Sequence, residues 1–150
     1  MVIKLTVPYS GDVSSNRYMR NTPKGGRYVI ESARLWSLFV KSGLNSRLPQ
    51  DYSPEQLDPA HPFDLDVYVA FPRQFSKRSG DASNFDKWPR DIVTSVLQTP
   101  NEDAGTSGTP TATYGHKDEA FILLTIKLHF QNGLHDNDEN AEYNWDYKTP

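Results

Sequence analysis

A strict alternation of side chains over residues 65–71 is the feature that most constrains the fold of this chain. Every second position is apolar, and the segment stops at Pro72, which has no amide proton to give to a sheet. Because neighbouring side chains of a strand point to opposite faces, the pattern predicts a half-buried strand with one face toward a core. The core-facing set is Leu65, Val67, Val69 and Phe71.

Two further strands and three loops follow from patterns of the same kind. Apolar and β-branched residues alternate with polar ones over 2–7, and an apolar run over 121–130 predicts a strong last strand. Proline, glycine and small polar residues predict loops between the regular elements. These loops cover 8–28, 45–62 and 99–117, and the length of the third predicts a mobile surface segment.

Apolar residues at helical spacing predict two helices. The first covers 31–42, and Gly43 behind it is a plausible C-terminal stop. The second covers 84–98, where Pro89 indicates either a kinked first turn or a regular helix that begins at Trp88. Together with the strands, these helices predict an α+β fold in which a small mixed β-sheet packs with two helices.

The length of 150 residues fits a single domain with one core. We expect residues 1–130 to form this domain. Residues 131–150 form an acidic segment that also carries Tyr143, Trp145 and Tyr147. Two interpretations of this tail stand: a solvated, poorly ordered segment, or a segment that docks on the domain through its aromatic side chains.

Composition excludes several classes of protein. Cysteine is absent, so disulfides, thiolate nucleophiles and Cys-ligated zinc are excluded. No apolar run reaches the roughly 20 residues of a membrane span, and the N-terminal residues show no secretory signal, so we expect a cytoplasmic protein. The histidines show no ligand spacing and predict no zinc site; they are His61, His116, His129 and His135.

The net charge of −3 is unevenly distributed. Five of the 19 acidic residues but only one of the 16 basic residues fall in 131–150, so the rest of the chain is about neutral. Local basic patches within it suit phosphate contacts, although a solvated loop is the alternative interpretation of the first patch. The two patches are Arg17, Arg20, Lys24 and Arg27, and then Arg73, Lys77 and Arg78.

Carboxylates gather near the starts of two predicted elements. If helix extends from Asn84, then Asn84, Lys87 and Asp91 share one face. A few carboxylates suit magnesium when a phosphate supplies further oxygens, and a neighbouring lysine offsets charge on that phosphate. The alternative interpretation is a set of capping and solvent-facing residues. The acidic residues outside the helical face are Asp81, Asp118 and Glu119.

Three ordered segments resemble the RusA family of junction-resolving endonucleases. Leu5-Thr6-Val7-Pro8 with Ser15-Asn16-Arg17-Tyr18-Met19-Arg20 is similar to the family's opening strand, proline and S-x-N-R-Y segment. Asp81-x-x-Asn84-x-x-Lys87-x-x-x-Asp91 is similar to the family's D-x-D-N-x-x-K-x-x-x-D pattern. Asp118-Glu119 ahead of residues 121–127 is similar to the aspartate pair that leads into the family's last strand.

This resemblance implies a RusA-like single domain and a homodimer that cuts symmetry-related strands of a four-way DNA junction with Mg²⁺ or Mn²⁺. By the same resemblance, Asp81, Asp118 and Glu119 would form the metal-binding cluster, and Lys87 would face the phosphate. Supporting positions would be Ser83, Asn84 and Asp91. The DNA-binding surface would join the first motif to both basic patches, with Asn16, Arg17, Tyr18, Arg20, Lys24, Arg27, Arg73, Lys77 and Arg78.

Ser83 departs from this resemblance, because the family pattern has an aspartate there. Three hypotheses therefore remain. The first is a Mg²⁺-dependent endonuclease that resolves Holliday junctions or other branched DNA in recombination and repair. The second is a catalytically impaired RusA-like protein that binds branched DNA or a protein partner without cutting. The third is a globular interaction module with no role on nucleic acid, which the low overall charge favours.

Overall fold

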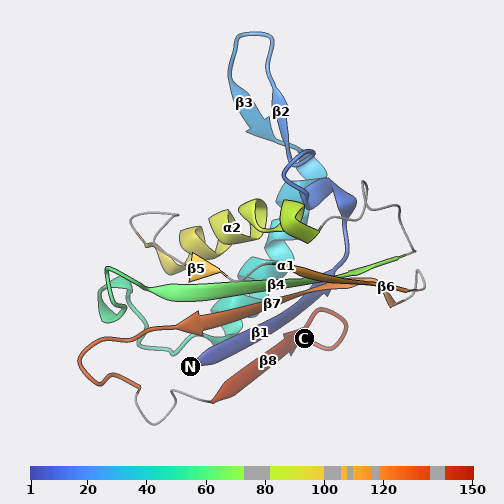
Figure 1. Cartoon of the computed structure of the whole chain (residues 1–150). Helices are drawn as coiled ribbons and strands as arrows, with labels where there is room; N and C mark the ends of the chain where they lie inside the picture. The colour runs from blue at the N-terminus through green and yellow to red at the C-terminus, as the bar shows by residue number, and fades with distance from the viewer. Residues whose placement is uncertain (73–81, 100–105, 108–109, 116–118, 136–140) are drawn as a thin grey trace.

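A mixed β-sheet with two α-helices on one face forms the body of the molecule in a computed structural model (Figure 1). The structure describes residues 1–72, 82–99, 106–107, 110–115, 119–135 and 141–150, and all structural statements concern these residues. The predicted α+β class is confirmed, with a second, two-stranded sheet added to the main one.

The main sheet has six strands in the order β5-β4-β7-β1-β8, and β6 also pairs with β4. The central strand β7 runs antiparallel to both β1 and β4, whereas β8 is parallel to β1, and β5 and β6 are parallel to β4. The strands are β1 (Val2–Pro8), β4 (Phe63–Phe71), β5 (Thr106–Ser107), β6 (Thr111–Tyr114), β7 (Phe121–Leu128) and β8 (Glu142–Asp146).

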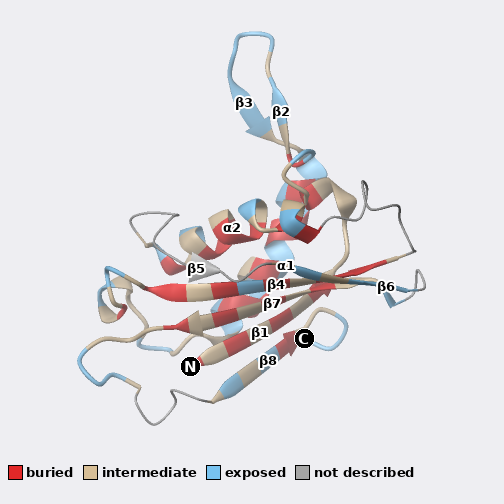
Figure 2. Cartoon of the chain, in the orientation of Figure 1, coloured by how far each residue is buried: buried red, intermediate tan, exposed pale blue. Residues whose placement is uncertain are grey.

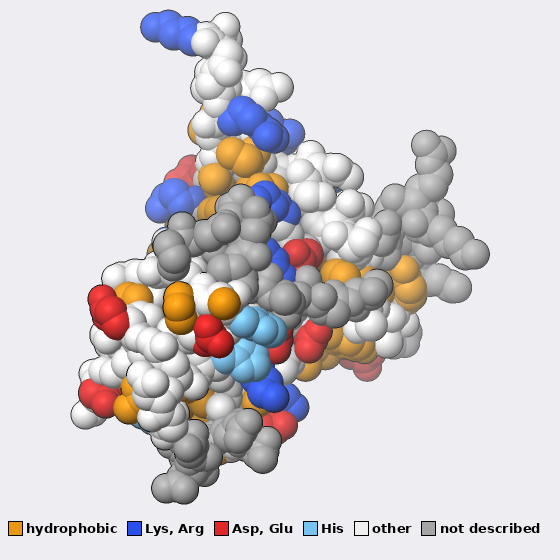
Figure 3. Space-filling model, turned by 60° about the vertical axis from the view of Figure 1, so that its left-hand side comes forward, with side chains coloured by type: hydrophobic (Ala, Val, Ile, Leu, Met, Phe, Trp, Pro, Cys, Tyr) orange, Lys and Arg blue, Asp and Glu red, His pale blue; other side chains and the backbone are white. Residues whose placement is uncertain are grey.

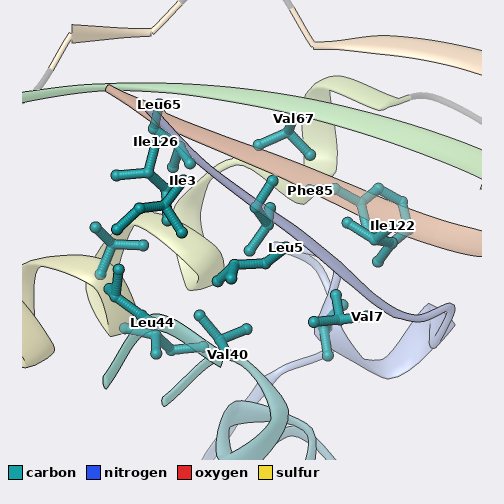
Figure 4. Packing of buried hydrophobic residues seen from close by; sticks show 14 of the residues in the cluster. Ile3, Leu5, Val7, Val40, Leu44, Leu65, Val67, Phe85, Ile122 and Ile126 are labelled. Carbon is teal, nitrogen blue, oxygen red and sulfur yellow. The ribbon is translucent and has the colours of Figure 1, made fainter. Parts of the chain in front are cut away.

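Alternate residues of the three central strands face the helices. The burial pattern repeats every second residue along β1, β4 and β7, as the predicted alternation requires (Figure 2). Val40 and Leu44 of helix α1 (Glu31–Arg47) pack against this face (Figure 4). Helix α2 (Lys87–Leu97) adds Ile92, Val93 and Leu97 to the same core.

Helix α1 does not stop at Gly43, as the sequence predicted, but continues to Arg47. Gly43 lies where α1 crosses β8, and a Cβ added there would stand 2.6 Å from Cε3 of Trp145. The glycine therefore allows close packing inside the helix instead of ending it. The helix ends before Leu48-Pro49, because the residue ahead of a proline avoids helical backbone angles.

The second predicted helix is divided. A 3-10 turn, η3 (Ala82–Phe85), precedes α2, which begins at Lys87. Pro89 lies in the first turn of α2, where its missing amide proton removes no helical hydrogen bond. Asn84 is therefore outside the regular helix that Lys87 and Asp91 share.

The predicted loop over 8–28 contains a second sheet. After the 3-10 turn η1 (Gly11–Val13), β2 (Met19–Asn21) and β3 (Arg27–Val29) pair antiparallel. Gly25, with φ +87°, allows the turn between them. This β2–β3 hairpin extends away from the main sheet (Figure 1).

The end of the chain docks on the domain. β8 pairs with β1, and Trp145 is only 6% exposed. Of the two interpretations of the tail, the structure therefore supports docking through aromatic side chains for residues 141–150, and not a solvated segment. The predicted loop over 99–117 likewise contains β5 and β6 on the free edge of β4, and 45–62 contains a 3-10 turn, η2 (Pro54–Gln56).

Within the described residues, no helix has the length and apolar character needed to cross a membrane.

Candidate functional site

Three parallel strands end at the same edge of the sheet. Pro8 at the end of β1 pairs with Phe121 at the start of β7, and Phe71 at the end of β4 pairs with Tyr114 at the end of β6. The segments that follow these strand ends carry the residues predicted to act on nucleic acid. We call this region the carboxyl edge.

Aromatic rings hold η3 at the carboxyl edge. The ring of Phe71 contacts those of Phe85, Tyr9 and Tyr114, at centroid distances of 5.6, 5.7 and 5.2 Å. Burial raises the pKa of Tyr9, while the positive charge of Arg17 acts in the opposite direction. The turn η3 and the loop after β1 are thus fixed to the ends of β1, β4 and β6.

The first two motifs of the RusA resemblance touch each other. The amide of Ser15 donates to the carbonyl oxygen of Asn84 at 2.6 Å, and the hydroxyl of Ser15 donates to Oδ1 of Asn84 at 3.3 Å. Three residues after Ser15 and four residues after Asn84, the ring of Tyr18 stacks on that of Trp88, with centroids 5.2 Å apart. Segments nearly 70 residues apart in sequence are therefore neighbours in the fold.

Lys87 lies exposed on the first turn of α2, and its Nζ is 3.4 Å from Oδ1 of Asp91, which is more buried. Asp91 therefore restrains the lysine from the next turn of the helix. Ser83 is exposed in η3. On another side of α2, Asp86 accepts a hydrogen bond from Nε of Arg90 at 3.1 Å, and Arg90 is 8% exposed, so this second pair belongs to the packing of the helix.

Glu119 is the member of the predicted acidic cluster that the structure describes. It lies exposed two residues before β7, and its Oε2 would be 3.1 Å from a Cβ added to Gly115. The amide of Gly115 donates to the carbonyl oxygen of Phe71, so the Glu119 carboxylate lies at the carboxyl edge. Asp81 and Asp118 fall outside the described residues.

The first basic patch lies mainly on the β2–β3 hairpin. Arg20, Lys24 and Arg27 are exposed along it, and Arg17 is exposed just before it, so their charges extend away from the body of the molecule (Figure 3). Tyr18 differs from the prediction, because it is 5% exposed beneath Trp88 and cannot contact DNA through its ring. Asn16 is exposed, whereas Arg73, Lys77 and Arg78 fall outside the described residues.

A further group was missed by the sequence analysis. His61, Asp64 and His129 offer three ligand atoms that all lie within 4.8 Å of one another, although the spacing of the histidines in sequence predicted no zinc site. His61 and Asp64 are three residues apart at the start of β4, which is a weak sequence signal. His129 joins them through the register of β4 and β7, which the sequence does not specify.

No protein-family model matches this chain, and a search of the curated proteins gives no match.

Proposed function

We propose that this protein is a Mg²⁺-dependent endonuclease that cuts four-way junctions or other branched DNA, acting as a homodimer. The observation that carries the proposal is the contact between two motifs that resemble the RusA family. Ser15 and Tyr18 of the first motif touch Asn84 and Trp88 of the second, at the carboxyl edge and at the base of a basic hairpin.

In this proposal the carboxylates of Asp81, Asp118 and Glu119 would hold Mg²⁺. Oxygen ligands of this kind suit the ion, and a bound Mg²⁺ would supply Lewis-acid activation of a water and compensation of charge on the leaving oxygen. The exposed position of Glu119 at the carboxyl edge supports the assignment, because a phosphate can reach it.

Lys87 is the residue that we expect to face the reacting phosphate. Its side chain is about half exposed and is restrained by Asp91, so its charge is held on the first turn of α2. A fixed positive charge stabilises the negative charge that builds on the phosphate in the transition state. In this scheme Asp91 positions the lysine, and Asn84 fixes the loop that carries Asn16 and Arg17.

The hairpin supplies the DNA contacts. Four basic residues between Arg17 and Arg27, without an acidic residue among them, neutralise phosphates and so bind DNA independently of its sequence. Tyr28 is 51% exposed beside them and offers a ring on which an unstacked base can lie.

The homodimer requires a surface that a second copy covers. An apolar groove of about 490 Å³ lies between α1 and the end of the chain, and we place the interface there. Leu35, Leu38 and Phe39 are 47%, 50% and 39% exposed along it, and Trp145 and Tyr147 complete its walls. Sedimentation of the wild-type protein and of Leu38→Glu tests this, with a dimer and a monomer as the expected results.

The second candidate function is binding of branched DNA without cleavage. Ser83 favours it, because a neutral hydroxyl stands where the family pattern has a carboxylate. In that case the basic hairpin would still bind the junction, and cleavage would be absent.

The experiment that separates the two candidates uses a labelled synthetic four-way junction and a linear duplex of the same sequence, each with magnesium or with EDTA. Paired nicks in the junction that require magnesium support the endonuclease. Binding of the junction without nicks supports the second candidate. If the protein neither binds nor cleaves the junction, both candidate functions are overturned.

A further inference from the structure

The group formed by His61, Asp64 and His129 lies at the end of the strand pair β4–β7 that is opposite to the carboxyl edge. Nε2 of His61 is 2.6 Å from Oδ1 of Asp64, and Nε2 of His129 is 2.8 Å from Oδ2 of the same carboxylate. The two imidazole rings lie 4.5 Å apart between centroids. Both histidines thus direct the same ring nitrogen at one carboxylate.

The backbone fixes all three residues. Phe63 pairs with Leu128 in the sheet, and the amide of His129 donates to the carbonyl oxygen of Pro62 at 3.0 Å. The carbonyl oxygen of His129 accepts from the amide of Asp58 at 2.9 Å, and the amide of His61 donates to the carbonyl oxygen of Asp58 at 3.2 Å. The positions of both histidines are therefore set by the fold and not by their contact with Asp64 alone.

The distances suit a metal ion with nitrogen and oxygen ligands. Bonds of about 2.0–2.1 Å in a tetrahedral zinc site place neighbouring ligand atoms about 3.3 Å apart. The three ligand atoms here span separations from 2.6 Å up to at most 4.8 Å, so small side-chain rotations reach that spacing. Two imidazoles and one carboxylate are also a ligand set that first-row transition metals accept.

An ion can reach the group from solvent. The side chains of His61, Asp64 and His129 are 43%, 32% and 28% exposed. His129 also lines a hollow of about 270 Å³ together with Asp58, Lys127 and His135, whereas His61 and Asp64 do not line it.

We propose that His61, Asp64 and His129 form a transition-metal site that is separate from the carboxylate cluster of the proposed endonuclease. Zinc is the ion with which we test it. The ion joins the loop ahead of β4 to the end of β7. Because it binds the folded chain and needs residues from two elements, it raises the melting temperature, and the rise grows with the logarithm of the zinc concentration relative to the dissociation constant.

The test is a titration of chelator-treated full-length protein with ZnCl₂, followed by calorimetry and by thermal unfolding. We expect saturable binding of one zinc per chain and a higher melting temperature. His61→Ala and His129→Ala should each weaken binding at least tenfold, because each removes one of three ligands. His135→Ala is the matched control: it removes a histidine that lines the same hollow but is not part of the group.

Circular dichroism of the variants without zinc checks that they fold. If an alanine variant fails to fold, Asp64→Asn provides a second variant with a side chain of the same size. Absence of saturable zinc binding by the wild-type protein would overturn the proposal and leave a hydrogen-bonded cluster only. Equal zinc affinity in His61→Ala and wild type would overturn it as well. Junction cleavage in magnesium should be the same in His61→Ala, which keeps this test distinct from that of the proposed endonuclease.

Discussion

The ring of Tyr18 lies stacked on the ring of Trp88, with an angle of 20° between their planes. Nε1 of Trp88 donates in turn to the carbonyl oxygen of Ala33 in α1, and the amide of Ile30 donates to the carbonyl oxygen of Tyr18. The base of the basic hairpin is thus fixed to the first turns of both helices. The orientation of the hairpin relative to Lys87 depends on this stack.

Tyr18→Ala should destabilise the protein. The substitution removes a buried ring from beneath Trp88, and truncation of a buried aromatic residue costs about 3–5 kcal/mol. We expect a loss of about 3 kcal/mol in the free energy of unfolding, measured by urea denaturation. Arg17→Ala, at an exposed neighbouring position, should change it by less than about 0.5 kcal/mol. Equal stability of the two variants would mean that the stack contributes little.

Lys87→Ala should abolish most of the cleavage and leave the fold intact. Loss of one group that stabilises transition-state charge lowers the rate about 10²–10³-fold, whereas loss of an exposed ion pair costs about 0–1 kcal/mol of stability. The assay is single-turnover cleavage of the four-way junction. The control is Arg34→Ala, which breaks the exposed pair with Glu31 on α1. Normal cleavage by Lys87→Ala would show that the lysine does not act on the phosphate.

Ser83→Asp should increase magnesium-dependent cleavage if a missing ligand limits the site. Ser83 is exposed in η3, so an added carboxylate has room there. The measurement compares cleavage rates of Ser83→Asp and Ser83→Asn over a series of magnesium concentrations, since asparagine matches aspartate in size but lacks its charge. A rate equal to that of the wild type would mean that another residue completes the site.

Removal of the hairpin charges should weaken DNA binding and its dependence on salt. For duplex DNA, the slope of log affinity against log salt falls by about 0.9 for each phosphate that the protein no longer neutralises. The triple variant Arg20→Ala, Lys24→Ala, Arg27→Ala should therefore lower the slope by about 2–3, as measured by fluorescence anisotropy. Lys148→Ala, an exposed cation outside the hairpin, should leave it unchanged. Identical slopes for the wild type and the triple variant would show that the hairpin does not bind phosphates.

Gly43→Ala should destabilise the protein although alanine favours a helix by about 1 kcal/mol over glycine. The new methyl group would meet Cε3 and Cδ2 of the Trp145 ring at 2.6 and 2.7 Å. Overpacking of this kind costs about 1–3 kcal/mol, so we expect a net loss in thermal unfolding. Ser42→Ala, at the preceding exposed position, is the control and should be neutral or slightly stabilising. A gain in stability for Gly43→Ala would mean that Trp145 moves without cost.

Local patterns were sufficient for the long elements. The strands β1, β4 and β7 bury alternate side chains, so their own sequences predict them. β6 offers no such signal, because three of its four residues are exposed, and its pairing depends on the free edge of β4. β8 and the β2–β3 hairpin are also short, and their partners are set by the tertiary fold.

The sequence predicted some of the local geometry around the candidate site but not all of its contacts. The spacing of Lys87 and Asp91 predicted that they share one face of a helix, because residues four apart are neighbours there, and the structure adds an ion pair between them. The burial of Tyr18 was not predictable, because it depends on how Trp88 packs across the core. The meeting of His61 with His129 required the register between two strands, which one sequence does not reveal.

The parallel pairing of β8 with β1 affects how the chain folds as it is synthesised. β1 leaves the ribosome before β7, and β8 leaves it only after β7, so one edge of β1 lacks its neighbour until residues 142–146 appear. Until then the backbone groups of that edge are open to other chains. Co-translational folding of this domain therefore remains vulnerable to aggregation up to the arrival of the strand that carries Trp145.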